Sequence, residues 1–224
     1  MRKSDLRYHD VLEKIEAVMI TYHPRTAEPK ELIPAAVLIP VFNKNDEAHL
    51  LLTLRTETVA QHKGQVSFPG GAREESDSSL KVTALRETEE EIGLSRENVR
   101  LLGALDDFPT VTNYMVRPFV GEISYPSSLK INKSEVARLL EVPFSLFLSE
   151  KNFEVKQWRH GNNTYPVYFY HFGRHLIWGA TAYIINHFVD LVFGYNPAPN
   201  PVLRDPRNAA YLRENLVRRG TRSS

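Results

Sequence analysis

Four glutamates fall within five residues of this chain, at Glu87, Glu89, Glu90 and Glu91. On a helix, residues i, i+3 and i+4 lie on one face, so Glu87, Glu90 and Glu91 share a stripe and Glu89 points elsewhere. Three carboxylates so close repel one another, and a divalent cation would relieve that repulsion. Mg²⁺ and Mn²⁺ prefer hard oxygen ligands, and Mg²⁺ often shares a substrate phosphate. The stripe predicts a site for Mg²⁺ or Mn²⁺, the alternative being an ordinary solvated helix face.

The elements that must position this stripe are a loop and a helix. A helix is predicted over residues 78–94, because two serines can cap its start and Gly93 suits its C-terminal end. One loop upstream lie Gly70 and Gly71, where the backbone can pass close to a ligand. The sequence thus predicts that a glycine turn and an acidic helix face meet at one site.

The sequence from Arg86 to Leu94 resembles the second half of the Nudix box, G-x5-E-x7-R-E-U-x-E-E-x-G-U, where U is aliphatic. Thr88 departs from that pattern at an aliphatic position. The first half fits only as Gly71-x5-Asp77, with the loop one residue longer and an aspartate in place of the glutamate. The resemblance implies an α+β fold of Nudix type, an α/β/α sandwich with a mixed sheet and a catalytic loop and helix.

A second resemblance lies upstream, in LLTLRTETVAQHKGQVSFPGG at residues 51–71. This segment is similar to the signature of the coenzyme A pyrophosphatase branch of the Nudix hydrolases, L-L-T-x-R-[SA] followed by R-x3-G-x3-F-P-G-G. Thr56 replaces the Ser or Ala, and Ala60 stands where the branch usually has Arg. Later segments, as far as Phe193, also look like this branch, so the resemblance covers most of the chain.

The resemblance implies an enzyme, a Nudix diphosphatase that needs Mg²⁺ or Mn²⁺. Its substrate would be coenzyme A or a thioester of it, cleaved at the diphosphate to 3',5'-ADP and (acyl-)4'-phosphopantetheine. Two alternatives stay open: hydrolysis of ADP-ribose, a nucleotide sugar or another nucleoside diphosphate derivative, and a non-catalytic nucleotide-binding module. Ala60 and the lengthened loop keep the first alternative open. The intact set of glutamates argues against the second.

The stripe and the resemblance together give three groups of expected site residues. The expected metal ligands are Glu87, Glu90 and Glu91. The expected catalytic residues are Glu90, Glu91, Arg86 and Glu135. The expected substrate-binding residues are Arg55, Lys63, Gly70 and Gly71.

Several of these residues have two interpretations. The base for the attacking water is Glu90 or a carboxylate from another segment, for which Glu135 is the candidate. Otherwise Glu135 is a charge near a helix N-terminus. Arg86 is expected to pair with a carboxylate of the box and to hold the loop. Arg55 and Lys63 either recognise phosphate groups or are ordinary solvated surface charges.

Composition narrows the remaining classes of function. A formal net charge of +1 gives no global field for nucleic acid or an anionic membrane, and the absence of cysteine excludes disulfides, zinc–thiolate sites and thiol catalysis. The first residues lack the apolar core of a signal peptide, which predicts a cytoplasmic protein. The expected partner is a small molecule, with no nucleic acid and no membrane; a homodimer is one assembly that the resemblance allows.

The 224 residues are expected to form an N-terminal helix and linker at 1–30, a Nudix domain at 31–194 and a basic C-terminal arm at 195–224. The N-terminal part is helical by the spacing of its apolar residues. Within the domain, strands are predicted at 31–42, 48–56, 99–108, 116–124, 153–161 and 164–172. Helices besides the acidic one are predicted at 134–148 and 181–193.

Overall fold

The large sheet is built around one strand, β1 (Ile33–Lys44), in a computed structural model that describes residues 6–27, 31–56, 64–125, 129–160 and 163–197. This strand pairs antiparallel with β2 (Glu47–Arg55) and parallel with β7 (Tyr114–Ile123). The described strands give an eight-stranded sheet with the central order β3-β2-β1-β7-β5. Of its other strands, β4 pairs with β1, β6 with β7 and β8 with β2. The remaining strands of this sheet are β3 (Val66–Ser67), β4 (Gly70–Ala72), β5 (Val99–Ala104), β6 (Phe108–Pro109) and β8 (Val136–Pro143).

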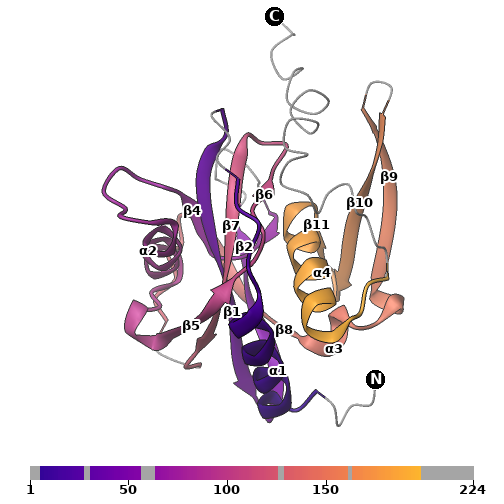
Figure 1. Cartoon of the computed structure of the whole chain (residues 1–224), viewed down its shortest axis with the longest axis horizontal. Helices are drawn as coiled ribbons and strands as arrows, with labels where there is room; N and C mark the ends of the chain where they lie inside the picture. Colours follow the sequence, from indigo (N-terminus) through magenta and orange to yellow (C-terminus); the bar gives the residue numbers. More distant parts are fainter. Residues whose placement is uncertain (1–5, 28–30, 57–63, 126–128, 161–162, 198–224) are drawn as a thin grey trace, which may run out of the picture.

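A second, three-stranded sheet follows in the order β11-β10-β9. Figure 1 shows α2 on one side of the large sheet and α4 on the other, between the large and the small sheet. This mixed α+β architecture confirms the predicted fold class. None of the helices in the described part of the chain is long and apolar enough to span a bilayer. The elements outside the large sheet are α1 (Tyr8–Thr21), α2 (Leu80–Ile92), η2 (Arg96–Asn98), α3 (Phe144–Phe147), η3 (Glu150–Asn152), β9 (Phe153–His160), β10 (Asn163–Phe172), β11 (His175–Trp178) and α4 (Ala180–Phe193).

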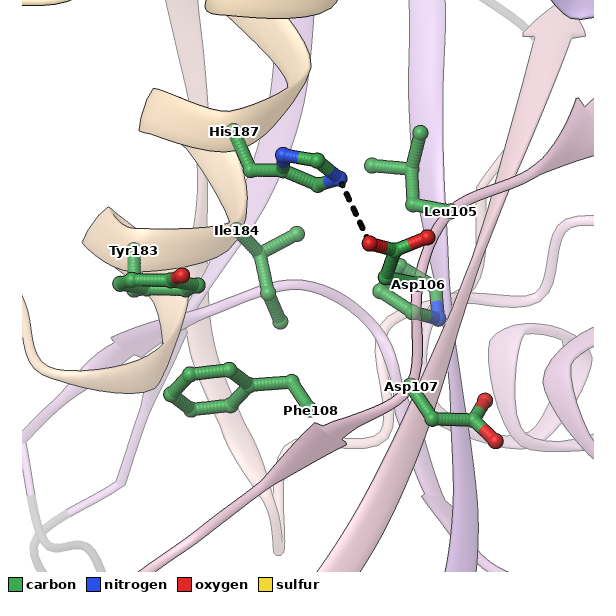
Figure 2. A pocket seen from close by; sticks show the side chains of 8 residues that line it. Leu105, Asp106, Asp107, Phe108, Tyr183, Ile184 and His187 are labelled. Carbon is green, nitrogen blue, oxygen red and sulfur yellow. Dashed lines mark ion pairs between the residues drawn. The ribbon is translucent and has the colours of Figure 1, made fainter. Parts of the chain in front are cut away.

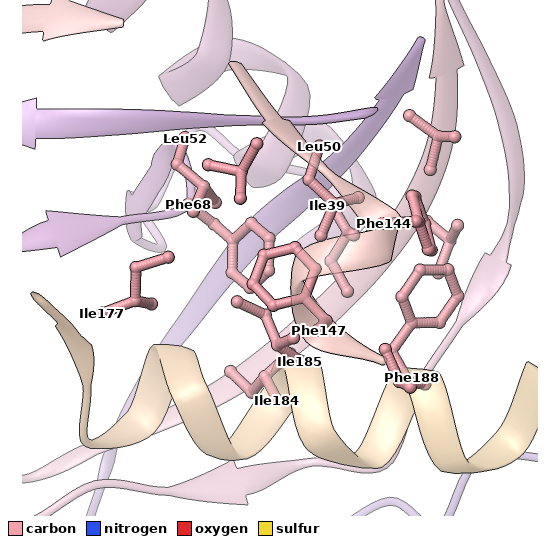
Figure 3. Packing of buried hydrophobic residues seen from close by; sticks show 14 of the residues in the cluster. Ile39, Leu50, Leu52, Phe68, Phe144, Phe147, Ile177, Ile184, Ile185 and Phe188 are labelled. Atoms are coloured by element: carbon pink, nitrogen blue, oxygen red, sulfur yellow. The ribbon is translucent and has the colours of Figure 1, made fainter. Parts of the chain in front are cut away.

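Alternate residues of the two central strands face opposite layers, as the two-residue period of a strand requires. Leu38 and Leu51 pack with Ile92 of α2 in one buried cluster. Ile39 and Leu50 belong to the larger cluster on the other face, which Figure 3 shows meeting Phe147, Ile185 and Phe188. Because both faces are covered, β1 and β2 are almost continuously apolar in sequence. Strand β4, which contains Gly70 and Gly71, pairs with this buried β1.

Helix α2 begins and ends as its sequence predicts. The hydroxyl of Ser79 accepts a hydrogen bond from the backbone N–H of Val82, which caps the N-terminus. Gly93 adopts a left-handed conformation, with φ of 71°, and donates its N–H to the carbonyl of Glu89. Thr88, which stands at an aliphatic position of the box, is buried and donates its hydroxyl to the carbonyl of Ala84. The helix therefore tolerates the departure without a lost hydrogen bond.

The prediction of a helix at 134–148 is wrong. Residues Val136–Pro143 form β8, which pairs antiparallel with β2, and only Phe144–Phe147 are helical. The run contains buried Val136, Leu140 and Val142, and so short an apolar run fits either period. The free edge of β2 decided between them, because it offers a ladder of backbone hydrogen bonds. The interpretation of Glu135 as a charge at a helix N-terminus is therefore also wrong.

The predicted N-terminal helix is present as α1. The strands predicted at 48–56, 116–124, 153–161 and 164–172 are present with bounds that differ by one or two residues at most. The helix predicted at 181–193 is α4, and it is buried along most of its length. The strand predicted at 99–108 is split into β5 and β6. The predicted arm at 195–224 lies almost wholly outside the described residues.

Candidate active site

Strand β4 and helix α2 bring Gly71 directly against Glu87. A Cβ atom added to Gly71 would lie 2.5 Å from Cδ of Glu87, which is closer than side chains approach. Gly71 has an ordinary negative φ, so the carboxylate and not the backbone conformation requires the glycine here. Glu87 thus sits where only a bare backbone leaves it room.

Gly70 is required for a different reason. Its φ is 149°, and an added Cβ would meet the backbone carbonyl of Ala36 on the neighbouring strand. Its N–H donates to Oε2 of Glu91 at 3.2 Å. Gly70 therefore lets β4 lie close against β1 and presents an amide to a carboxylate.

Glu91 is the most buried carboxylate of the stripe, with 3% of its side chain exposed. Besides the Gly70 amide, it accepts a hydrogen bond from Nη1 of Arg55 at 3.3 Å. Burial is the main cause that raises the pKa of Glu91 to about 7; Arg55 and Gly70 oppose the shift, and the negative charges of Glu87 and Glu135 add to it. A positive charge close to Glu91 would therefore stabilise its ionised carboxylate.

Glu135 lies close enough to act electrostatically on both buried members of the stripe. The pKa of Glu87 is raised by burial, opposed by Arg86, and raised further by the charges of Glu90 and Glu135. The half-buried Glu135 accepts a hydrogen bond from the side-chain amide of Asn132 at 3.2 Å. It comes from the segment before β8, so the structure brings a fourth carboxylate to the stripe from a distant part of the sequence.

Arg86 clamps the loop between β4 and α2. Its Nε donates to Oδ1 of Asp77 at 3.1 Å, and its Nη2 donates to Oδ2 of Asp77 at 3.0 Å and to the carbonyl of Ala72 at 3.1 Å. Asp77 also accepts bonds from the hydroxyl of Thr83 and the N–H of Glu74. The bond from Arg86 holds the pKa of the Asp77 carboxyl well below its usual range. The lengthened loop thus keeps a buried carboxylate–guanidinium pair, a role of Asp77 that the Gly71-x5-Asp77 spacing alone left open.

The two remaining glutamates of the run point in different directions. Glu90 accepts a bond from Nη1 of Arg86 at 3.0 Å, and its side chain is largely exposed. Glu89 lies toward Arg96, with 3.6 Å between their charged atoms, and is turned away from the others as predicted. Arg86 also reaches Glu87 at 2.9 Å, so one guanidinium partly neutralises two members of the stripe.

The donor set suits a hard divalent cation. Glu87 and Glu91 are carboxylates whose pKa values are raised first by burial and further by neighbouring negative charges, and the missing side chain of Gly71 makes room for Glu87. Within the described ranges, no three Asp, Glu or His side chains converge tightly enough to form a ready-made metal cage. Arg55, Arg86 and the Gly70 amide hold these carboxylates instead. Mg²⁺ commonly keeps waters and substrate oxygens as ligands, so a full protein cage is not required.

Two residues singled out in the sequence, Lys63 and Ala60, lie outside the described residues. The structure brings five of the predicted site residues together around the acidic stripe: Arg55, Gly70, Glu87, Glu91 and Glu135. Arg86 and Glu90 lie at the rim of this group.

A separate small cavity, of about 10 Å³, lies under α4 and is no substrate site. Figure 2 shows it between Tyr183, Ile184 and His187 of α4 and the segment Leu105–Phe108. Its volume holds about one water molecule at most. Asp106 at its edge lies 3.7 Å from Nε2 of His187 and accepts bonds from Arg25. This cluster ties α4 to the large sheet.

Replacing Gly71 by alanine is expected to lower kcat/KM by about 10- to 100-fold with little loss of stability, because the new methyl group displaces the mobile end of Glu87. Gly70→Ala is the matched control, since its methyl group meets fixed backbone and should chiefly destabilise the fold. Urea unfolding and diphosphatase assays on both variants measure the two effects. Full activity in Gly71→Ala would show that Glu87 is not needed in its observed position.

The chain is similar in sequence to known proteins. The sequence pattern of the NUDIX domain matches residues 32–159. A protein of Photorhabdus laumondii named "Uncharacterized Nudix hydrolase NudL" is 41% identical over 158 residues, which are 70% of this chain and 84% of the relative. A protein of the same name from Citrobacter koseri is 33% identical over 197 residues, covering 88% of this chain and all of the relative. Among solved structures, a C. elegans Ap4A hydrolase binary complex matches with a TM-score of 0.43 and 15% identity, over 51% of this chain and 82% of that one.

Proposed function

The chain belongs to the Nudix family of hydrolases, and from this premise we propose that it cleaves the diphosphate bond of coenzyme A or its thioesters. The products would be 3',5'-ADP and (acyl-)4'-phosphopantetheine. Hydrolysis of a nucleoside diphosphate derivative is the activity that family membership carries. Coenzyme A as the substrate is the proposal.

One observation carries the choice of substrate. The described parts of the segment similar to the coenzyme A pyrophosphatase signature, residues 51–56 and 64–71, include β3 and parts of β2 and β4, and two of their residues contact the buried carboxylate. Arg55 and Gly70 both donate hydrogen bonds to Glu91. The signature therefore supplies the immediate surroundings of the acidic stripe. This placement supports a role for the signature in the reaction, because its residues stand next to the carboxylates.

The residues around the stripe have separate tasks in the proposed reaction. Glu87, Glu90 and Glu91 would hold Mg²⁺ or Mn²⁺, which would supply the positive charge that a diphosphate needs before an oxygen nucleophile can approach. Gly70 gives its N–H to Glu91, and Gly71 makes room for the carboxylate of Glu87. Arg86 keeps the loop closed through its bonds to Asp77 and Ala72.

A carboxylate must accept the proton of the attacking water, and Glu135 suits this task better than Glu90. Glu90 is already bound to Nη1 of Arg86, whereas the charge of Glu135 acts on Glu87 and Glu91. Among the described residues, the side chain of Glu135 is bound by the neutral amide of Asn132. Glu135→Gln is expected to lower kcat by about 10²-fold or more, and Glu90→Gln by less. Steady-state kinetics on the two variants show which replacement lowers kcat more. Normal kcat in Glu135→Gln would transfer the role to Glu90.

The proposed function is tested by a substrate panel with mass analysis of the products. The panel contains coenzyme A, acetyl-coenzyme A, ADP-ribose, NADH and a nucleotide sugar, each with Mg²⁺ or Mn²⁺ and with a chelator as blank. Release of phosphopantetheine and 3',5'-ADP is the expected result. Cleavage of ADP-ribose or the sugar nucleotide without cleavage of coenzyme A would replace the proposal by the broader alternative. Binding without hydrolysis of any diphosphate would indicate a nucleotide-binding module.

A further inference from the structure

An open surface cavity of about 320 Å³, with exposed Ala137 and Arg174 among its lining residues, lies next to Arg55 of the acidic stripe's surroundings. Its lining residues are Leu54, Arg55, Gly64, Ala137, Arg174 and His175. Arg55 belongs both to this cavity and to the site, since it also bonds to Glu91. Arg174 and His175 come from the turn between β10 and β11, and β11 lies against β3. The volume is in the range of small-molecule sites.

Arg55, Arg138 and Arg174 bring positive charge to this cavity, and Glu91 pairs with Arg55. Arg174 lines it, and Arg138 follows the lining residue Ala137 on β8. Neither Arg138 nor Arg174 forms an ion pair with any residue in the described part of the chain. Arg55 has one ion pair, with Glu91, and its buried Nε has no hydrogen-bond partner among the described residues. Unpaired guanidinium groups around a hollow are suited to an anionic ligand with several oxygens.

The electrostatics of His175 agree with this arrangement. The pKa of its ring is lowered, first by burial and then by the positive charges of Arg174 and Arg138. Both guanidinium groups therefore act on the same ring at the edge of the cavity. An anion bound there would be surrounded by charges from β2, β8 and the β10–β11 turn.

We propose that this cavity binds a phosphomonoester of the substrate that takes no part in the reaction, the 3'-phosphate of an adenosine diphosphate derivative. The inference rests on the proposed function and extends it to specificity. The acidic stripe and its cation would engage the diphosphate, so the diphosphate does not account for the separate positive cluster. Arg55 connects the two places, which sets the second phosphate one side chain away from the reacting group. A substrate without the second phosphate leaves Arg174 and its neighbours without a counter-charge.

Arg174→Gln tests the proposal because it removes a charge without breaking any ion pair among the described residues. KM for coenzyme A is expected to rise about 10-fold or more, while KM for 3'-dephospho-coenzyme A changes less than about 2-fold. Arg7→Gln is the control, an exposed arginine of the N-terminal region paired with Asp10. Equal effects on both substrates, or no effect on either, would overturn the proposal.

A binding measurement makes the result independent of turnover. Calorimetric titration of the wild-type protein with 3',5'-ADP and with 5'-AMP should show tighter binding of 3',5'-ADP, and Arg174→Gln should lose that preference. A preference that survives in Arg174→Gln overturns the proposal, even if coenzyme A is hydrolysed. If coenzyme A is not hydrolysed but the preference exists and depends on Arg174, the proposed function fails and the phosphomonoester site stands.

Discussion

Glu91→Gln is expected to lower kcat by about 10²- to 10³-fold while the protein remains folded. The amide keeps the shape of the side chain and can still accept the Gly70 N–H, but it is a far weaker ligand for a divalent cation. Burying a neutral amide costs less than burying a carboxylate, so the loss of the Arg55 contact should not lower the melting temperature greatly. The measurement is steady-state hydrolysis with excess Mg²⁺ or Mn²⁺, together with thermal unfolding.

Glu89→Gln provides a matched control on the same helix. Glu89 carries the same charge two residues away but faces Arg96. Its replacement tests whether a general loss of negative charge explains the effect, and near-normal turnover is expected. Normal turnover in Glu91→Gln would contradict the assignment of the buried carboxylate to the metal site, and equal losses in both variants would point to helix charge alone.

Arg86→Ala is expected to have the largest effect on stability, a loss of about 3–5 kcal/mol in the free energy of unfolding. The change leaves the carboxylate of Asp77, whose side chain is 2% exposed, without its charged partner. It also removes the bond to the carbonyl of Ala72, so the loop that presents Gly71 loses its clamp. Urea denaturation measures the loss. Arg96→Ala is the matched control, because Arg96 pairs at the surface with Glu89 of α2. Its replacement should lower the free energy of unfolding by less than about 1 kcal/mol.

The pair of Asp77 and Arg86 also predicts that the free energy of unfolding depends on pH. The folded-state pKa of Asp77 is depressed by Arg86, so the pair contributes stability above the unfolded pKa of about 4. That contribution is lost as the pH falls toward the folded-state pKa. In Arg86→Ala the isolated carboxylate favours its neutral form, so the difference from wild type should shrink on acidification. Adding Asp77→Asn to Arg86→Ala should recover part of the stability at pH 7. A difference that stays constant down to pH 3, with no recovery in the double variant, would contradict the buried pair.

Much of the local structure followed from short-range patterns. The period of the helix placed Glu87, Glu90 and Glu91 on one side and Glu89 on another, and the structure shows Glu89 turned away. The serine cap and Gly93 fixed the ends of α2. Patterns of this kind depend on residues within one or two turns, so a sequence is enough to predict them.

The segment at 134–148 shows where that reasoning fails. Val136, Leu140 and Val142 fit a helix or a strand, and the free edge of β2 selected the strand. That choice also decided how Glu135 is presented, because it precedes a strand and lies near Glu87 and Glu91. The position of the edge of β2 cannot be predicted from the residues of the 134–148 segment alone.

The amino-acid sequence alone determined the family and the acidic helix with its stripe, because each depends on residues close together along the chain. The predicted turn at Gly70 and Gly71 is instead part of strand β4, which pairs with β1. Only the tertiary structure decided that Gly70 meets the backbone of β1 whereas Gly71 meets a carboxylate. It also decided that Arg174 and His175 share a cavity with Arg55. These relations are set by how sheets and helices pack across long sequence separations, where burial and electrostatic contact depend on distance in space and not on spacing in sequence.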